Sequence, residues 1–124
     1  MNPQEALAFP AFHVVPKQWG EERWLENSDG YCAKLLIVAP GRRCSDHRHF
    51  KKSETFILLH GSCVIQVGDH QQLYLRGAKV PVPVGTWHWF GIEGPSDEFC
   101  VILEISTHHE DDDCERRRDS GAFN

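Results

Sequence analysis

The chain has 124 residues, enough for one domain with a buried core that needs no disulfide bridges. Its formal net charge of −5 argues against non-specific binding to nucleic acids, which requires a basic face. No run of about 18 apolar residues occurs, so we expect no membrane span. The N-terminus has no basic stretch followed by a long apolar core, so we expect no secretory signal.

Residues 1–18 contain three prolines, which disfavour a helix and predict an extended arm with one short strand at 12–15. From Trp19 onward, short apolar segments alternate with turns that contain Gly, Pro or Asp. The predicted strands are 19–27, 31–38, 54–59, 62–67, 72–75, 79–82, 87–91 and 99–106. Strands at roughly 8–12-residue intervals predict an all-β sandwich or barrel, which we place at 19–107.

The remaining residues, 108–124, are densely charged. They predict a solvated, partly ordered tail or a short surface helix, in which His108 and His109 lie at the surface. The alternative is an arm that docks on a neighbouring subunit or caps the mouth of the barrel.

The cysteines are odd in number and include no Cys-x-x-Cys pair. They are Cys32, Cys44, Cys63, Cys100 and Cys114. Small buried thiols in a reducing compartment fit this pattern better than a disulfide framework does. We therefore expect a cytoplasmic protein.

Three histidines and one glutamate carry the chemistry. His47 and His49 are two residues apart, so on a strand both imidazoles face the same side. Glu54 follows five residues later, and His88 comes from a later strand. Such a set suits one divalent transition metal, among manganese, zinc, iron, nickel and cobalt. It leaves two positions of an octahedron open, as a catalytic metal requires.

The joint spacing is more specific than any of its parts. It reads Gly41-x5-His47-x-His49-x4-Glu54-x6-Gly61, then Gly77-x5-Pro83-x-Gly85-x2-His88. In both motifs the sequence resembles the cupin superfamily. It departs only at Ile92, a non-ligand position where the family often has Asn. The resemblance implies a conical barrel of two antiparallel sheets, the double-stranded β-helix, with the metal inside near the wider mouth.

Strand parity predicts which side chains accompany the metal ligands. Phe56, Leu58 and Phe90 share a face with ligands and should point inward. Trp87 and Trp89 have the opposite parity and should lie in the outer layer or at a subunit interface. A small barrel with edge strands and apolar outer residues predicts a homodimer.

Segments outside the metal motifs resemble a narrower group. WGEERWLEN at 19–27, YCAKLL at 31–36, HRHFKKSETF at 47–56 and ILEISTHHEDDD at 102–113 are similar to the D-lyxose isomerase branch of cupin sugar isomerases. They are also similar to the cupin domains of mannose-phosphate isomerase and guanylyltransferase proteins. The resemblance implies aldose–ketose interconversion of a monosaccharide or sugar phosphate by an enediol route, with a metal on the C1 and C2 oxygens and a base that moves a proton.

Three further residues are candidates for catalysis. Glu104 lies in an apolar run, where burial would raise its pKa and suit it as a general base. Lys52 precedes Glu54 by two residues and can donate to a sugar oxygen. Lys34 can pair with Glu104 or point into the pocket. The alternatives are a solvated rim lysine at 52 and outward or salt-bridged strand residues at 34 and 104.

Three functions stay open at this point. A metal-dependent sugar isomerase is favoured, and it expects a polar pocket with Lys and Glu near the metal. A non-catalytic sugar-binding cupin expects no acid or base within reach of the metal. A metal-dependent dioxygenase expects an apolar pocket, although Glu54 departs from the three-His sites of cupin thiol dioxygenases.

Overall fold

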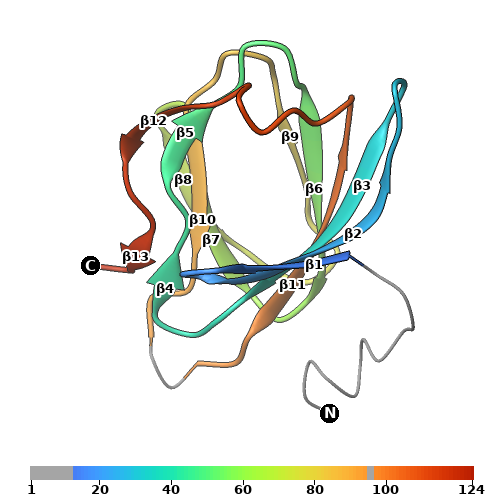
Figure 1. Ribbon diagram of the computed structural model, residues 1–124. Coiled ribbons are helices and arrows are strands. Elements are labelled where there is room, and N and C mark those ends of the chain that lie inside the picture. The colour runs from blue at the N-terminus through green and yellow to red at the C-terminus, as the bar shows by residue number, and fades with distance from the viewer. Residues whose placement is uncertain (1–12, 95–96) are drawn as a thin grey trace.

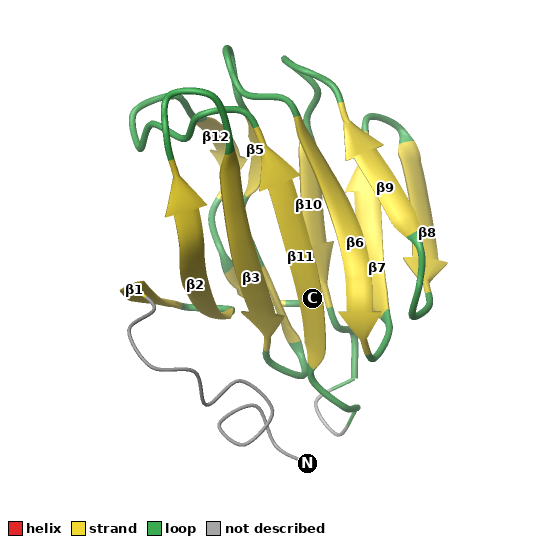
Figure 2. Ribbon diagram, turned by 90° about the vertical axis from the view of Figure 1, so that its right-hand side faces the viewer, coloured by secondary structure: helices red, strands yellow, loops and turns green. Residues whose placement is uncertain are grey.

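The computed structural model describes residues 13–94 and 97–124, and within these residues the chain forms strands, turns and loops without a helix. Two antiparallel sheets face each other (Figure 1). The order in the first sheet is β1 (His13–Lys17), β2 (Gly20–Asn27), β3 (Cys32–Val38), β11 (Cys100–Ser106), β6 (Glu54–His60) and β9 (Lys79–Val82). Figure 2 shows this sheet from its outer side. The predicted all-β fold is confirmed.

The second sheet carries most of the histidines of interest. Its order is β12 (Glu115–Arg118), β5 (Asp46–Arg48), β10 (His88–Gly91), β4 (Arg42–Arg43) and β13 (Gly121–Ala122), with β7 (Cys63–Val67) paired to β10 and β8 (His70–Tyr74) paired to β7. Strand β10 is therefore central, because β4 and β5 pair with opposite ends of one edge and β7 pairs with the other edge.

Each strand predicted between residues 19 and 106 overlaps an observed strand. Strands β4, β5, β12 and β13 have no counterpart among the predicted segments, and β1, β12 and β13 extend the two sheets on either side of 19–107. The strand predicted at 12–15 coincides with the start of β1, apart from residue 12, which lies outside the described residues together with the rest of the N-terminal arm.

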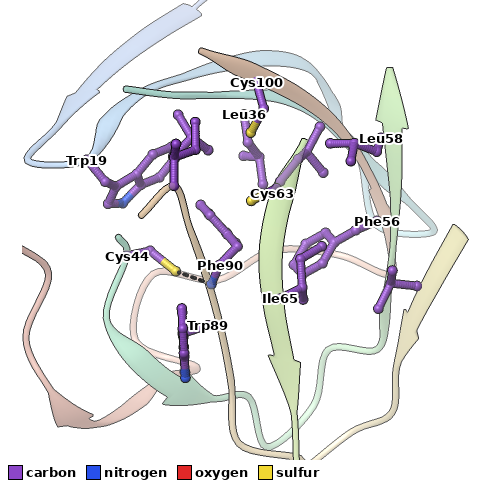
Figure 3. Close-up of a cluster of buried hydrophobic side chains, with 14 of the residues drawn as sticks. Trp19, Leu36, Cys44, Phe56, Leu58, Cys63, Ile65, Trp89, Phe90 and Cys100 are labelled. Atoms are coloured by element: carbon purple, nitrogen blue, oxygen red, sulfur yellow. Dashed lines mark hydrogen bonds between the residues drawn. The ribbon is translucent and has the colours of Figure 1, made fainter. Parts of the chain in front are cut away.

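The core lies between the two sheets and is built from alternate residues of their strands (Figure 3). Phe56, Leu58 and Phe90 all belong to it, as parity predicts, and each is at most 3% exposed. The ring of Trp19 meets that of Phe90 edge-on, with 5.0 Å between centroids. This apolar cluster fills the barrel beneath the polar site described below.

The two outward tryptophans are covered by the C-terminal segment of the same chain. The Trp89 indole donates to Gln66 Oε1 at 3.2 Å, and its ring packs 5.7 Å from that of Phe123. Trp87 is half-buried beneath the guanidinium groups of Arg48 and Arg117. Their outer-layer position agrees with parity, and no second subunit is needed to bury Trp89.

The charged tail does not form the surface helix that was one of its two predicted forms. Glu115–Arg118 pair with β5 as β12, and Gly121–Ala122 pair with β4 as β13. The segment between β11 and β12 crosses the same end of the barrel as the loop between β5 and β6 (Figure 1). Unpaired edges of the short strands β4 and β5 offer the hydrogen bonds that draw the tail back onto the barrel.

All five cysteines, which lie within the described residues, are unpaired, as expected. Four are buried, and the Cys44 sulfur accepts a hydrogen bond from the Phe90 backbone N–H (Figure 3).

Among the described residues there is no helix long and apolar enough to cross a membrane.

We expect Gly91→Ala to lower the free energy of unfolding by about 1–3 kcal/mol, as overpacking typically does. A Cβ at this position would lie 2.6 Å from the Cβ of Arg43 and 2.9 Å from the carbonyl oxygen of Arg42, where β10 and β4 pair. Gly30→Ala is the matched control, because a Cβ there meets nothing within 4 Å. Urea unfolding of both variants tests this, and equal stability of the two would contradict it.

Candidate metal centre

The three predicted histidine ligands meet at one end of the second sheet. His88 begins β10 and is the cross-strand partner of His47 in β5, while His49 lies one residue past the end of β5. One nitrogen from each imidazole lies within 4.8 Å of the corresponding atoms of the other two. The structure therefore brings together three imidazoles that are up to 41 positions apart in the chain.

Each imidazole is held by its Nδ1 atom. Nδ1 of His47 contacts the carbonyl of Ser45 at 2.7 Å, and Nδ1 of His88 contacts the carbonyl of Thr86 at 2.9 Å. Nδ1 of His49 contacts the carbonyl of Asp113 at 2.6 Å. A carbonyl oxygen only accepts, so Nδ1 carries the proton in each ring and donates it. In the neutral rings Nε2 then presents a lone pair, the form that binds a metal.

Glu54 faces these lone pairs. Its Oε1 lies 3.1 Å from Nε2 of His88, and its Oε2 lies 3.5 Å from Nε2 of His49. Oε2 is buried and lies 3.4 Å from the Lys52 ammonium, but it accepts no hydrogen bond among the described residues. Acceptors that converge in this way need either a shared proton or a cation between them. The donor set therefore fits a divalent transition metal, with three nitrogen ligands and one oxygen ligand.

The electrostatics keep most of this set in its ligating form. Burial, followed by the nearby His88, lowers the pKa of His47 to about 3, so this ring is neutral at neutral pH. Burial alone would raise the pKa of Glu54, but the hydrogen bond with His88 and the charge of Lys52 outweigh it and hold that pKa well below its usual range. Burial opposes the charge on His88, but the hydrogen bond and the charge of Glu54 outweigh burial and raise its pKa, so a metal at this ring would compete with a proton.

Two of the three predicted catalytic residues, Lys52 and Glu104, form a buried cluster with Glu54. The Lys52 ammonium is 3.4 Å from Glu54 Oε2 and 3.1 Å from Glu104 Oε2, and all three side chains are nearly inaccessible to solvent. Burial opposes the charge on Lys52, but the two carboxylates outweigh it and raise its pKa. Burial and the neighbouring Glu54 raise the pKa of Glu104. The solvated rim position considered for Lys52 is thus ruled out.

Lys34 continues this row of charges across the first sheet. It is the cross-strand partner of Glu104 and is only 1% exposed. Its ammonium lies 3.6 Å from Glu22 Oε1 and 4.2 Å from the centroid of the Trp24 ring. Of the two positions predicted for Lys34, the structure shows the one in the pocket wall, and the ion pair of its ammonium is with Glu22 rather than with Glu104.

A cavity of about 120 Å³ opens over these groups. One water needs about 10–15 Å³ on this scale, so the space admits a small organic molecule. The polar part of its lining includes His47, His49, Lys34, Lys52, Glu22, Glu54 and Glu104. Trp19, Phe56 and Phe90 supply apolar walls. The cavity is thus lined by charged side chains on part of its surface and by aromatic rings on another part.

The model of the family described as "Mannose-6-phosphate isomerase C-terminal" matches residues 5–119 of this sequence. The chain belongs to this family. The predicted resemblance to cupin sugar isomerases is confirmed, because curated proteins similar to this chain include D-lyxose isomerases. A D-lyxose/D-mannose isomerase of Thermosediminibacter oceani is 27% identical over 113 residues, which cover 69% of this chain and 61% of that protein. A mannose-1-phosphate guanylyltransferase of Sinorhizobium fredii is 28% identical over 91 residues, which cover 73% of this chain and 17% of that protein.

The chain thus spans less than two thirds of the curated relatives it matches. Solved structures agree on the fold. Oxalate decarboxylase from Bacillus subtilis superimposes with a TM-score of 0.74 at 16% identity, covering 86% of this chain and 30% of that one. A cupin-2 domain from Rhodospirillum rubrum gives a TM-score of 0.71 at 20% identity, covering 83% and 74%. These likenesses establish that this member of the mannose-6-phosphate isomerase C-terminal family has the cupin fold.

Some residues in or next to this family member's pocket were not anticipated from the sequence. His109, expected at the surface, lines the cavity, and its Nδ1 lies 3.1 Å from the Lys52 ammonium. Asp113 is buried and accepts hydrogen bonds from three backbone N–H groups at 50–52. Burial raises its pKa, but these three bonds outweigh burial and lower it. Glu22 could have been found from parity, because it lies two residues from Trp24 on the inner face of β2.

Proposed function

We propose that this protein is a divalent-metal-dependent isomerase that interconverts an aldose and a ketose, with the metal held by His47, His49, Glu54 and His88. The family and the printed activity of the D-lyxose/D-mannose isomerase relative support a sugar or sugar phosphate as substrate. When bound, the cation supplies Lewis acidity at the sugar carbonyl and stabilises the negative charge that develops during enolisation.

One observation supports this function above the others: a buried acid–base pair adjoins the metal ligands. Lys52 contacts both Glu54 and Glu104, so a substrate oxygen at the metal lies next to a proton donor and a carboxylate. Aldose–ketose interconversion requires one base that carries a proton between neighbouring carbons. The raised pKa of Glu104 suits this role, because the group then holds and releases a proton closer to neutral pH.

The chain's own residues divide the work as follows. Glu104 takes the proton from one carbon and returns it to the next, while the Lys52 ammonium donates a hydrogen bond to the oxygen on which charge develops. Lys34 and Glu22 form the far wall of the cavity and bind hydroxyl groups remote from the reacting carbons. The aromatic walls exclude water from the base.

The alternative functions differ in what they require of the pocket. The charged lining disfavours the dioxygenase, which expects an apolar chamber. The second candidate is a non-catalytic sugar-binding cupin, and the surroundings of Lys52 favour it. The Lys52 ammonium is already surrounded by Glu54, Glu104 and His109, and this saturation suits a structural ion pair as well as a catalytic one.

Turnover in heavy water separates these two candidates. The protein loaded in turn with manganese, zinc, iron, nickel and cobalt is incubated with a panel of pentoses, hexoses and their phosphates. We expect one sugar to yield its ketose or aldose isomer with deuterium at C1 or C2, and a chelator-treated sample to yield none. A sugar that binds by calorimetry without turnover or exchange under any metal would establish the binding protein instead.

The homodimer and the cytoplasmic location stay predictions from the sequence.

A further inference from the structure

Asp113 makes an unusual number of contacts for one residue of a charged tail. Its Oδ1 accepts hydrogen bonds from the backbone N–H groups of Phe50 at 2.8 Å and Lys51 at 3.0 Å, and its Oδ2 accepts one from Lys52 at 3.1 Å. Its carbonyl oxygen accepts the Nδ1 proton of His49 at 2.6 Å. The residue is only 5% exposed. Four bonds therefore join it to a segment that is more than 60 positions earlier in the chain.

The segment that Asp113 binds connects two metal ligands. Strand β5 ends before His49 and β6 begins at Glu54, so the residues between them belong to no strand. Their backbone N–H groups lack ladder partners, and the carboxylate of Asp113 takes the place of a neighbouring strand for three of them. The position of this loop sets where His49 and Glu54 point.

His49 differs from the other two histidines in how it is oriented. His47 and His88 donate to carbonyls two residues earlier in their own segments, so local chain geometry suffices to hold them. His49 donates to a carbonyl that the C-terminal segment delivers. The pairing of β12 with β5 and the turn at 110–113 place that carbonyl.

We propose that Asp113 is a positioning residue for the metal centre, in which the carboxylate fixes the 50–52 loop and the carbonyl fixes the His49 ring. The inference rests on the metal centre proposed above. Under this proposal, the complete set of metal ligands forms only when the C-terminal segment is docked on the barrel. The tail is therefore part of the metal site. Partners of this kind fix the tautomer and orientation of a ligand, and their loss typically weakens metal affinity about 10–100-fold.

Asp113→Ala removes the carboxylate, and Asp112→Ala is the matched control. Asp112 is the preceding residue, carries the same charge and is exposed. Affinity for Mn²⁺ and Zn²⁺ is measured by competition with a chromophoric chelator, well below each variant's melting temperature. We expect Asp113→Ala to bind about 10–100-fold more weakly than Asp112→Ala. Equal affinity in the two folded variants would overturn the proposal.

A readout without metal separates positioning from general stability. In metal-free protein, ¹⁵N NMR of the imidazole rings reports the tautomer of each histidine. Alanine keeps the backbone carbonyl that His49 contacts, but without the carboxylate nothing ties residue 113 to the 50–52 loop, so this carbonyl moves away from the ring. We therefore expect Asp113→Ala to lose the Nδ1-protonated signature of His49 and to keep those of His47 and His88. Unchanged signatures at all three rings would count against the proposal even if the melting temperature fell.

Asp113→Asn covers the case in which the alanine variant does not fold. The amide keeps one acceptor for Phe50 and Lys51 but places an NH₂ group against the Lys52 N–H. We expect a smaller loss of metal affinity than in Asp113→Ala, and wild-type affinity would contradict the role. If the wild-type protein bound no metal while the His49 signature still changed, the metal centre would fail and the orienting contact would stand. If metal bound without any isomerase activity, only the proposed reaction would fail.

Discussion

Replacing His88 with alanine will abolish tight binding of a divalent metal and, with it, isomerase activity. His88 is 1% exposed, its Nδ1 is held by the Thr86 carbonyl, and its Nε2 faces Glu54 Oε1 at 3.1 Å. Without this ring, one of three nitrogen donors is lost. We expect the affinity to fall by more than the roughly 10–100-fold that the loss of an outer-shell partner costs. Chelator competition and metal analysis after dialysis measure the loss.

His60→Ala is the control for this experiment. His60 lies on the exposed side of β6, where its ring contacts Glu98. Circular dichroism establishes that both variants remain folded. One equivalent of metal bound by His88→Ala with the affinity of His60→Ala would refute the ligand assignment, and the fold would survive that result.

The fold and the four proposed ligands follow from local patterns in the sequence. The i, i+2 spacing of His47 and His49 predicts a shared face, and the polar turn before Glu54 and the Pro-Val-Gly turn before His88 predict where their strands begin. The structure brings these side chains together. Such patterns predict the direction of side chains because strand alternation is a property of the backbone, and it holds wherever the strand pairs, whereas metal binding by these four residues stays a prediction.

The contributions of the tail were beyond the reach of such reasoning. His109 and Asp113 belong to a charged run without periodicity, and their contacts with Lys52 and His49 join positions more than 50 residues apart. Strands β12 and β13 form because β5 and β4 have edges available for pairing. The sequence of residues 115–122 does not by itself predict these strands. The burial of Trp89 was also beyond sequence reasoning. Strand parity predicts the direction of its side chain, but it does not predict that the C-terminal segment covers the ring.

Lys52→Met will destabilise the metal-free protein strongly, by about 3–5 kcal/mol, because it leaves Glu54 and Glu104 buried without their shared cation. Lys51→Met is the neighbouring control. Its side chain is 71% exposed and pairs with Glu110 at the surface, so little change is expected. Chemical denaturation of both variants measures the difference. Equal stability of the two would show that the buried charges interact with solvent after all.

The loss of stability caused by Lys52→Met should depend on pH and on bound metal, each in a defined direction. The folded-state pKa of Glu104 already lies above its ordinary value, so folding favours its protonated form. Stability linked to this group is present at pH values below the unfolded pKa and falls as pH rises through the folded pKa. Loss of the Lys52 charge raises that folded pKa further. The loss of unfolding free energy in Lys52→Met, relative to wild type, should therefore be largest near neutral pH and smaller in mild acid.

A bound divalent cation will compensate the negative charge of Glu54. The loss of unfolding free energy in Lys52→Met should therefore also be smaller in the metal-loaded protein. Adding Glu104→Gln to Lys52→Met removes the second uncompensated charge and should restore part of the stability. A double-mutant cycle at neutral pH measures this coupling. Strictly additive losses would mean that Lys52 and Glu104 do not act as a pair, and the acid–base role assigned to them would lose its structural basis.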